Sequence, residues 1–196
     1  MKKIIAMLLA VMLVASLAAC GDKPATTDTT PATTEAKVEV PASALEILET
    51  VWGSYAEDEK FFVFGGNMGE NAVMDAPGKF DLTDTDGLTY SLLVPEAQAS
   101  SIDDAASLIH GMLSNNFTCG VYHVTGDVKA FAEAMKTAIM NNQWMCGMPE
   151  KVLVTVIGGE YVLVGYGIGD AINPFQAKLT AAYPAAEQLY FEDILQ

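Results

Sequence analysis

The residues of this chain with the most distinctive chemistry are three widely spaced cysteines, Cys20, Cys119 and Cys146. A strand through Cys119 and a returning helix of similar length would bring Cys146 back near Cys119. Outside the cytoplasm two such thiols can form a disulfide, and closing their loop would stabilise the fold by about 3 to 4 kcal/mol. The alternative is two buried free thiols. The sequence disfavours a redox-active pair, because it has no C-x-x-C motif and no basic residue next to either cysteine.

A soft-metal site is the second chemistry that these residue types allow. If Asn115-Asn116 forms a two-residue turn, Met112 lies opposite Cys119, with His110 and His123 on the same face of the hairpin. Thiolate, thioether and imidazole groups suit Cu(I). The candidate ligands are His110, Met112, Cys119, Met145, Cys146 and Met148. The same positions also suit a hydrophobic core in which methionine fills gaps, and we favour that interpretation.

Composition and motifs narrow the range of functions further. Neither G-x-S-x-G nor S-x-x-K, two signatures of serine hydrolases, is present. The chain contains no arginine, and its formal net charge is −15. Nucleic acid is therefore not an expected partner, because such binding depends on basic side chains that neutralise phosphates. We expect a protein that is not an enzyme and that has no cofactor.

Cys20 follows an apolar segment that is typical of a secretory signal. Lys2 and Lys3 precede the uncharged run 4–18, which is shorter than the about 20 residues of a transmembrane helix. The residues Leu17-Ala18-Ala19-Cys20 resemble the lipobox of bacterial lipoproteins. This resemblance implies cleavage before Cys20 and a diacylglyceryl group on its thiol, which would anchor the chain in the lipid bilayer at the extracytoplasmic face of the cell membrane. Ordinary secretory cleavage after Ala19 is the alternative.

These patterns divide the chain into three parts, with a signal peptide at 1–19, a tether at 20–41 and one domain at 42–196. The tether contains six threonines and two prolines between Gly21 and Val40. It has too few apolar residues to fold on its own, so we expect it to be disordered. The remaining length suits a single domain.

The domain has the pattern of an α+β fold, in which an antiparallel sheet of two hairpins carries helices on one face. Helical periodicity predicts helices at 44–56, 127–142 and 170–183. The β-branched runs on either side of Gly158-Gly159 predict a hairpin over 151–167. The segment 101–124 allows either a helix at its start or a second hairpin, and we favour the hairpin.

The order of signal, cysteine, tether, hairpin, helix, hairpin and helix is similar to an uncharacterised family of small Gram-positive lipoproteins, catalogued as a domain of unknown function. The resemblance covers roughly residues 70–183. It implies an architecture and a membrane address, and it supplies no catalytic residues. We therefore expect a membrane-anchored, extracytoplasmic binding or accessory module for an unknown protein or small ligand. Soft-metal handling and a thiol-redox accessory role are the alternatives.

Overall fold

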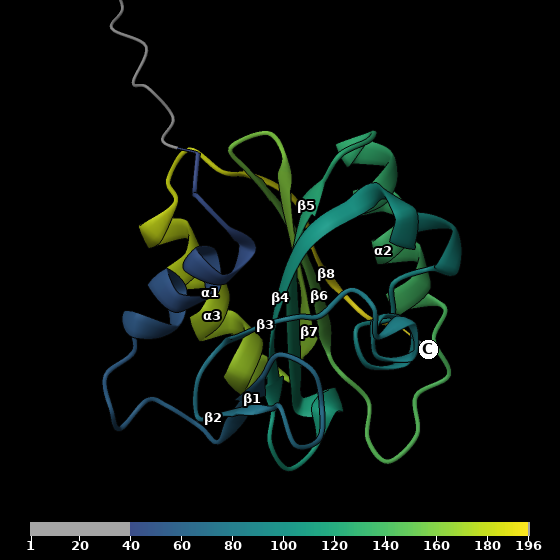
Figure 1. Cartoon of the computed structure of the whole chain (residues 1–196). Helices are drawn as coiled ribbons and strands as arrows, with labels where there is room; N and C mark the ends of the chain where they lie inside the picture. Colours follow the sequence, from purple (N-terminus) through teal and green to yellow (C-terminus); the bar gives the residue numbers. More distant parts are fainter. Residues whose placement is uncertain (1–39, 196) are drawn as a thin grey trace, which may run out of the picture. The chain divides into compact units, whose positions relative to one another are not determined.

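The computed structural model describes residues 40–195. Its central feature is an antiparallel sheet of eight strands, seven of them in the order β2-β1-β4-β5-β7-β6-β8, with β3 paired to β4 (Figure 1). The predicted signal peptide, Cys20 and almost all of the tether lie outside the described residues. Within residues 40–195, no helix is long and apolar enough to cross a membrane.

Two hairpins form the centre of the sheet, as predicted. The first joins β4 (Ile102–His110) to β5 (Phe117–Val124), and the second joins β6 (Lys151–Ile157) to β7 (Tyr161–Gly167). Gly158 and Gly159 both have positive φ, +62° and +84°, at the turn of the second hairpin. Glycine adopts this backbone conformation without the steric cost that a Cβ would add.

The three predicted helices are present as α1 (Ala44–Gly53), α2 (Val128–Met140) and α3 (Gly169–Ala182). Ser43 caps α1 and Asp127 caps α2, each by accepting a hydrogen bond from a first-turn amide. The α+β class is confirmed. A helical turn of π type (Gly87–Ser91) and two short 3₁₀ turns (Glu96–Ser101 and Ser114–Asn116) complete the helical structure that is described.

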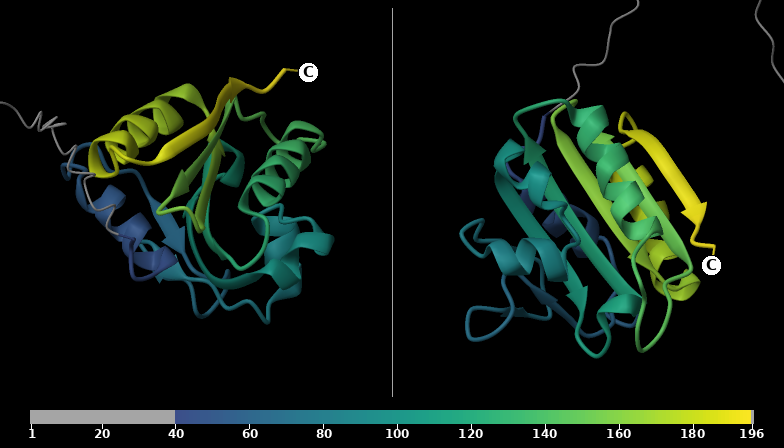
Figure 2. Two further views of the ribbon diagram at one scale, coloured as in Figure 1. Left: turned by 90° about the horizontal axis from the view of Figure 1, so that it is seen from above. Right: turned by 90° about the vertical axis from the view of Figure 1, so that its right-hand side faces the viewer.

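The expectation that the helices share one face of the sheet is wrong. Helices α1 and α3 cover one face and α2 covers the other (Figures 1 and 2). Because strand side chains alternate between faces, the sheet has two hydrophobic cores. Leu153 and Leu163 belong to the core under α1 and α3, whereas Val154 and Val164 belong to the core under α2.

The turn of the first hairpin differs from the predicted two-residue turn at Asn115-Asn116. Strand β4 ends at His110, whose Nδ1 accepts hydrogen bonds from the backbone amides of Met112 and Leu113, at 3.2 and 3.3 Å. The loop is therefore longer, and Cys119 lies opposite Leu108. The predicted pairing of Cys119 with Met112 is wrong.

Both edges of the sheet consist of strands that the two-hairpin prediction did not include. One edge is formed by the short strands β1 (Val63–Gly65), β2 (Val73–Met74) and β3 (Gly78–Lys79). The other edge is β8 (Glu187–Asp193), which pairs with β6. The register between β6 and β8 shifts between Val154 and Thr155, so one strand carries a bulge there.

Candidate functional site

The two cysteines of the domain are both free in the structure. Cys119 is fully buried in the core under α1 and α3, where its Sγ lies 3.7 Å from the position that a Cβ on Gly165 would take. Cys146 is exposed in the loop between α2 and β6, with a positive φ of 62°. The structure therefore does not form the predicted disulfide, because the chain does not return from α2 toward the buried face that carries Cys119.

The candidate metal ligands are likewise divided between the buried core, which holds Cys119, and the exposed surface, which holds Cys146 and Met145. Two hydrogen bonds of 2.8 Å, from the Asn115 side chain to the carbonyls of Met145 and Gly147, hold the Cys146 loop against the turn of the first hairpin. Met112 and Met145 are 84% and 79% exposed, and Met148 is half-buried. Within residues 40–195, no group of three or more His, Cys, Asp or Glu side chains is arranged to hold a metal ion.

The two histidines have structural contacts. His110 stacks on Phe61, with ring centroids 5.4 Å apart, and burial lowers its pKa. His123 is bound by two carboxylates, with Nε2 3.0 Å from Glu160 and Nδ1 2.5 Å from Asp103. The hydrogen bonds to Glu160 and Asp103 raise the pKa of His123. The imidazolium therefore holds the start of β4 to the turn between β6 and β7.

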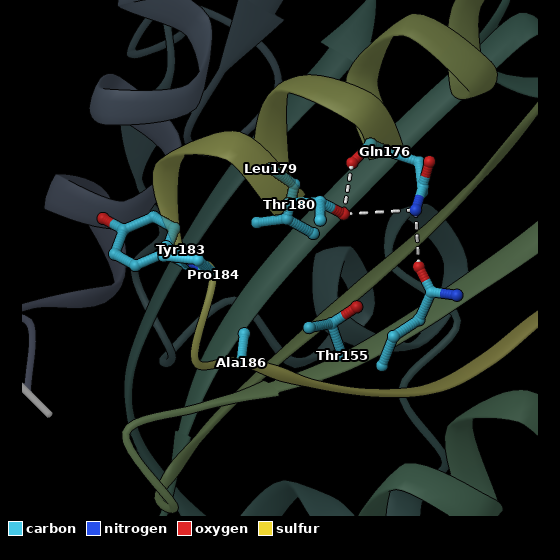
Figure 3. Close-up of a pocket in the computed structure, with 8 residues that line it drawn as sticks. Thr155, Gln176, Leu179, Thr180, Tyr183, Pro184 and Ala186 are labelled. Atoms are coloured by element: carbon cyan, nitrogen blue, oxygen red, sulfur yellow. Dashed lines mark hydrogen bonds between the residues drawn. The ribbon is translucent and has the colours of Figure 1, made fainter. Parts of the chain in front are cut away.

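The structure places its best candidate for a ligand site between α3 and strands β6 and β8 (Figure 3). This pocket, which we call the α3 pocket, has a volume of about 230 Å³. Its polar lining residues are Thr155, Gln176, Thr180 and Gln188, and its apolar lining residues are Leu179, Tyr183, Pro184 and Ala186. The register shift between β6 and β8 lies beside Thr155, where it interrupts the regular pairing of the two strands.

The floor of the α3 pocket is Thr155, in the middle of β6. Its side chain points from the sheet toward α3 (Figure 3), and the residue is only 3% exposed. The Thr155 hydroxyl has no hydrogen-bond partner within the described residues. Leaving such a buried hydroxyl unpaired costs about 1 to 3 kcal/mol, so this position is unusual in a strand whose other side chains are almost all apolar.

Two glutamines of the pocket lining, one on α3 and one on β8, are hydrogen-bonded to each other, and Figure 3 labels the first of them, Gln176. The Gln176 Nε2 atom donates to Oε1 of Gln188 at 2.7 Å and to the Thr180 hydroxyl at 3.2 Å. The Thr180 hydroxyl in turn donates to the Gln176 carbonyl at 3.0 Å. This network joins α3 to β8 and fixes the two amides near the buried hydroxyl.

Two other buried polar atoms lack partners within residues 40–195, the Tyr55 hydroxyl and Nε1 of Trp144. Neither residue lines the α3 pocket. Tyr55 packs in the core under α1 and α3, and burial raises the pKa of its hydroxyl. In the described part of the chain, only Thr155 combines an unpaired buried group with a pocket toward which its side chain points.

None of the residues that line this pocket was predicted from the sequence to belong to a functional site. The available signal was Thr155 itself, the one hydroxyl in the strand sequence VLVTVI. A threonine in such a strand is compatible with simple β-propensity, and only the tertiary structure shows that no partner meets its hydroxyl.

No family model matches the chain, and neither a curated protein nor a solved structure is significantly similar to it. The resemblance to small Gram-positive lipoproteins and the lipobox at Cys20 therefore stay predictions from the sequence.

Proposed function

We propose that this protein is a lipoprotein that binds a small ligand at the extracytoplasmic face of the cell membrane, without catalysing a reaction on it. Cys20 supplies the lipid anchor, residues 20–41 supply the tether, and the α3 pocket supplies the binding site. The lipobox pattern and the threonine-rich composition of the tether support the membrane address.

The observation that carries the binding proposal is the buried Thr155 hydroxyl, unpaired and directed into the α3 pocket. A ligand that hydrogen-bonds this hydroxyl would remove the cost of leaving it unpaired. Small-molecule sites commonly combine apolar walls with a few fixed polar groups, and the α3 pocket has this composition.

The chemistry of the pocket supports binding rather than catalysis. Its polar lining consists of two amides and two threonine hydroxyls. None of these groups titrates near neutral pH, so none is suited to act as a general base there. An accessory role toward another protein is compatible with ligand binding, since a tethered domain can present a bound ligand to a neighbour.

Nothing observed on residues 40–195 favours the soft-metal or thiol-redox alternatives. Cys119 is buried and burial raises the pKa of its thiol, whereas a reactive or metal-binding thiol must ionise. Cys146 is exposed in a separate loop.

The binding proposal is tested by NMR on the full mature chain, titrated with a library of small polar fragments. We expect binders to shift the amide signals of Thr155 and Gln188. The variant Thr155→Val keeps the shape of the side chain and removes the hydroxyl, so it should lose these responses. Thr137→Val, on the exposed surface of α2, is the matched control. A library without a single binder at the pocket would refute the proposal.

The anchor is tested separately by intact-mass analysis of protein purified from its native membrane. We expect a chain that begins at Cys20 and carries acyl chains on that residue. A mature chain with an unmodified Cys20 would contradict the membrane address and would leave the pocket argument untouched.

A further inference from the structure

We infer that the α3 pocket takes an uncharged, polyhydroxylated ring of monosaccharide size. This inference rests on the proposed function and names the ligand class. It follows from three properties of the pocket, namely its lack of charge, its hydrogen-bonding groups and its apolar wall.

The first property is the absence of charged lining. Among the described residues, no acidic or basic side chain lines the pocket, although the chain is rich in acids. The charged residues nearest in sequence are engaged elsewhere. Lys178 bonds Glu59 at 2.8 Å and the Ser54 carbonyl at 3.1 Å, and Glu187 pairs with Lys129 at 3.4 Å. An ionic ligand would lose hydration without gaining a counter-charge, so the pocket disfavours ions.

The second property is the set of hydrogen-bonding groups that remain available. The Thr155 hydroxyl can donate and accept, and it has no partner within the described residues. The Gln176 to Gln188 bond uses an amide NH₂ of the first and the amide oxygen of the second. This leaves the Gln176 oxygen to accept and the Gln188 NH₂ to donate. Hydroxyl groups complement this mixed set because each of them both donates and accepts.

The third property is the apolar wall formed by Leu179, Pro184 and Ala186. A pyranose ring carries C–H groups on its faces and hydroxyls at its edge, so it can contact this wall while its edge meets Thr155 and the amides. The volume of about 230 Å³ corresponds to roughly eight water molecules at about 30 Å³ each. One sugar ring fills such a space, and a longer saccharide would extend into solvent.

The test compares three sugars of one size and different charge on the full mature chain. The probes are methyl β-D-glucopyranoside, D-glucuronate and D-glucosamine, with binding followed by NMR shifts at Thr155 and by titration. We expect the neutral glucoside to bind and the two charged sugars to bind at least about tenfold more weakly. Thr155→Val should weaken glucoside binding about tenfold, the value of one hydrogen bond.

A second variant checks the electrostatic part of the inference. Gln188→Glu places a negative charge at the mouth of the pocket, and it should weaken glucoside binding and favour glucosamine. Thr137→Val, on α2, should bind as the unmodified chain does.

The outcomes separate this inference from the proposed function. If fragments bind at Thr155 but the glucoside does not, or if a charged sugar binds as well as the glucoside, the ligand class is wrong and the proposed function stands. If Thr155→Val binds the glucoside unchanged, the sugar does not use this hydroxyl and the inference is overturned. If neither fragments nor sugars bind, the proposed function fails as well.

Discussion

Two buried threonines lie in the same sheet, and they have opposite surroundings. Thr118 in β5 is 1% exposed, and its hydroxyl donates to the Ser114 carbonyl at 3.0 Å. Thr155 in β6 is 3% exposed and has no partner within the described residues. By the alternation of each strand, Thr118 belongs to the face under α2 and Thr155 to the face under α3.

The difference shows that burial of a polar side chain has opposite energetic consequences at these two positions of the sheet. The Thr118 hydroxyl closes the turn between β4 and β5, so its bond contributes to stability. The Thr155 hydroxyl lowers the stability of the ligand-free domain, because it is removed from water without a partner among the described residues. Thr118 is therefore part of the packing beside α2, whereas Thr155 meets the α3 pocket on the opposite face of the sheet.

The largest effect should concern Cys119, which shares its face with Thr155 but lies two strands away. If solvent reaches the buried side chains of the α3 face only at the α3 pocket, Cys119 reacts with N-ethylmaleimide only after unfolding. Its rate of modification should then be lower than that of Cys146 by on the order of a thousandfold or more. Peptide mass analysis identifies which thiol is modified. Similar rates for the two thiols would mean that the α3 face is open well beyond the pocket, and two thiols blocked until reduction would restore the disulfide.

The next effect is the loss of the paired hydroxyl. Thr118→Val should lower the free energy of unfolding by about 0.5 to 1.5 kcal/mol, because the part-buried hydrogen bond from Thr118 to the Ser114 carbonyl is lost. Urea unfolding monitored by circular dichroism measures this change. An unchanged midpoint would show that the turn does not depend on the bond.

The unpaired hydroxyl should behave in the opposite way. Thr155→Val should raise the free energy of unfolding of the ligand-free protein by up to about 1 kcal/mol, since an unsatisfied polar group is replaced by a methyl of the same shape. The same urea experiment measures it. A loss of stability comparable to that of Thr118→Val would erase the distinction between the two threonines and indicate a partner for Thr155.

The smallest effect concerns His123, a side chain with a hydrogen-bond partner at each of its two ring nitrogens. Its pKa is raised in the fold by Glu160 and Asp103, so its contribution to stability is complete below the unfolded pKa of about 6.5 and is lost as the pH rises through the folded value. Both carboxylates are about half exposed, which limits the contribution to about 0.5 to 1 kcal/mol.

Urea unfolding between pH 5.5 and pH 9 tests this prediction, with His123→Gln as the variant. The difference in stability between the unmodified chain and the variant should shrink as the pH rises. A difference that grows with pH would mean that the neutral ring, and not the imidazolium, holds the two carboxylates.

Local patterns were sufficient to predict the centre of the fold. The 3.6-residue spacing of Phe131, Met135 and Ile139 predicted α2, and Gly158-Gly159 predicted the turn between β6 and β7; both are confirmed. These elements are determined by residues close in sequence, so the local sequence pattern was enough to predict them.

Features that depend on distant residues were not predicted. The register of β4 and β5 depends on how His110 binds the loop after it and on Gly111, which packs against the ring of Phe62. The pocket depends on the approach of α3 and β8 to β6, three segments that the sequence does not place together. Thr155 was visible in the sequence, but its missing partner was not.

The two edges of the sheet have a consequence for how copies of this chain meet. The outer strand β8 carries Glu187, Glu192 and Asp193, whose charges are balanced by lysines of the same molecule, while the opposite edge strand β2 is only two residues long. Two molecules that approach through β8 would have to disturb these ion pairs, and β2 offers too little backbone for a stable ladder. The fold thereby resists strand-to-strand aggregation even where many copies are crowded on one surface.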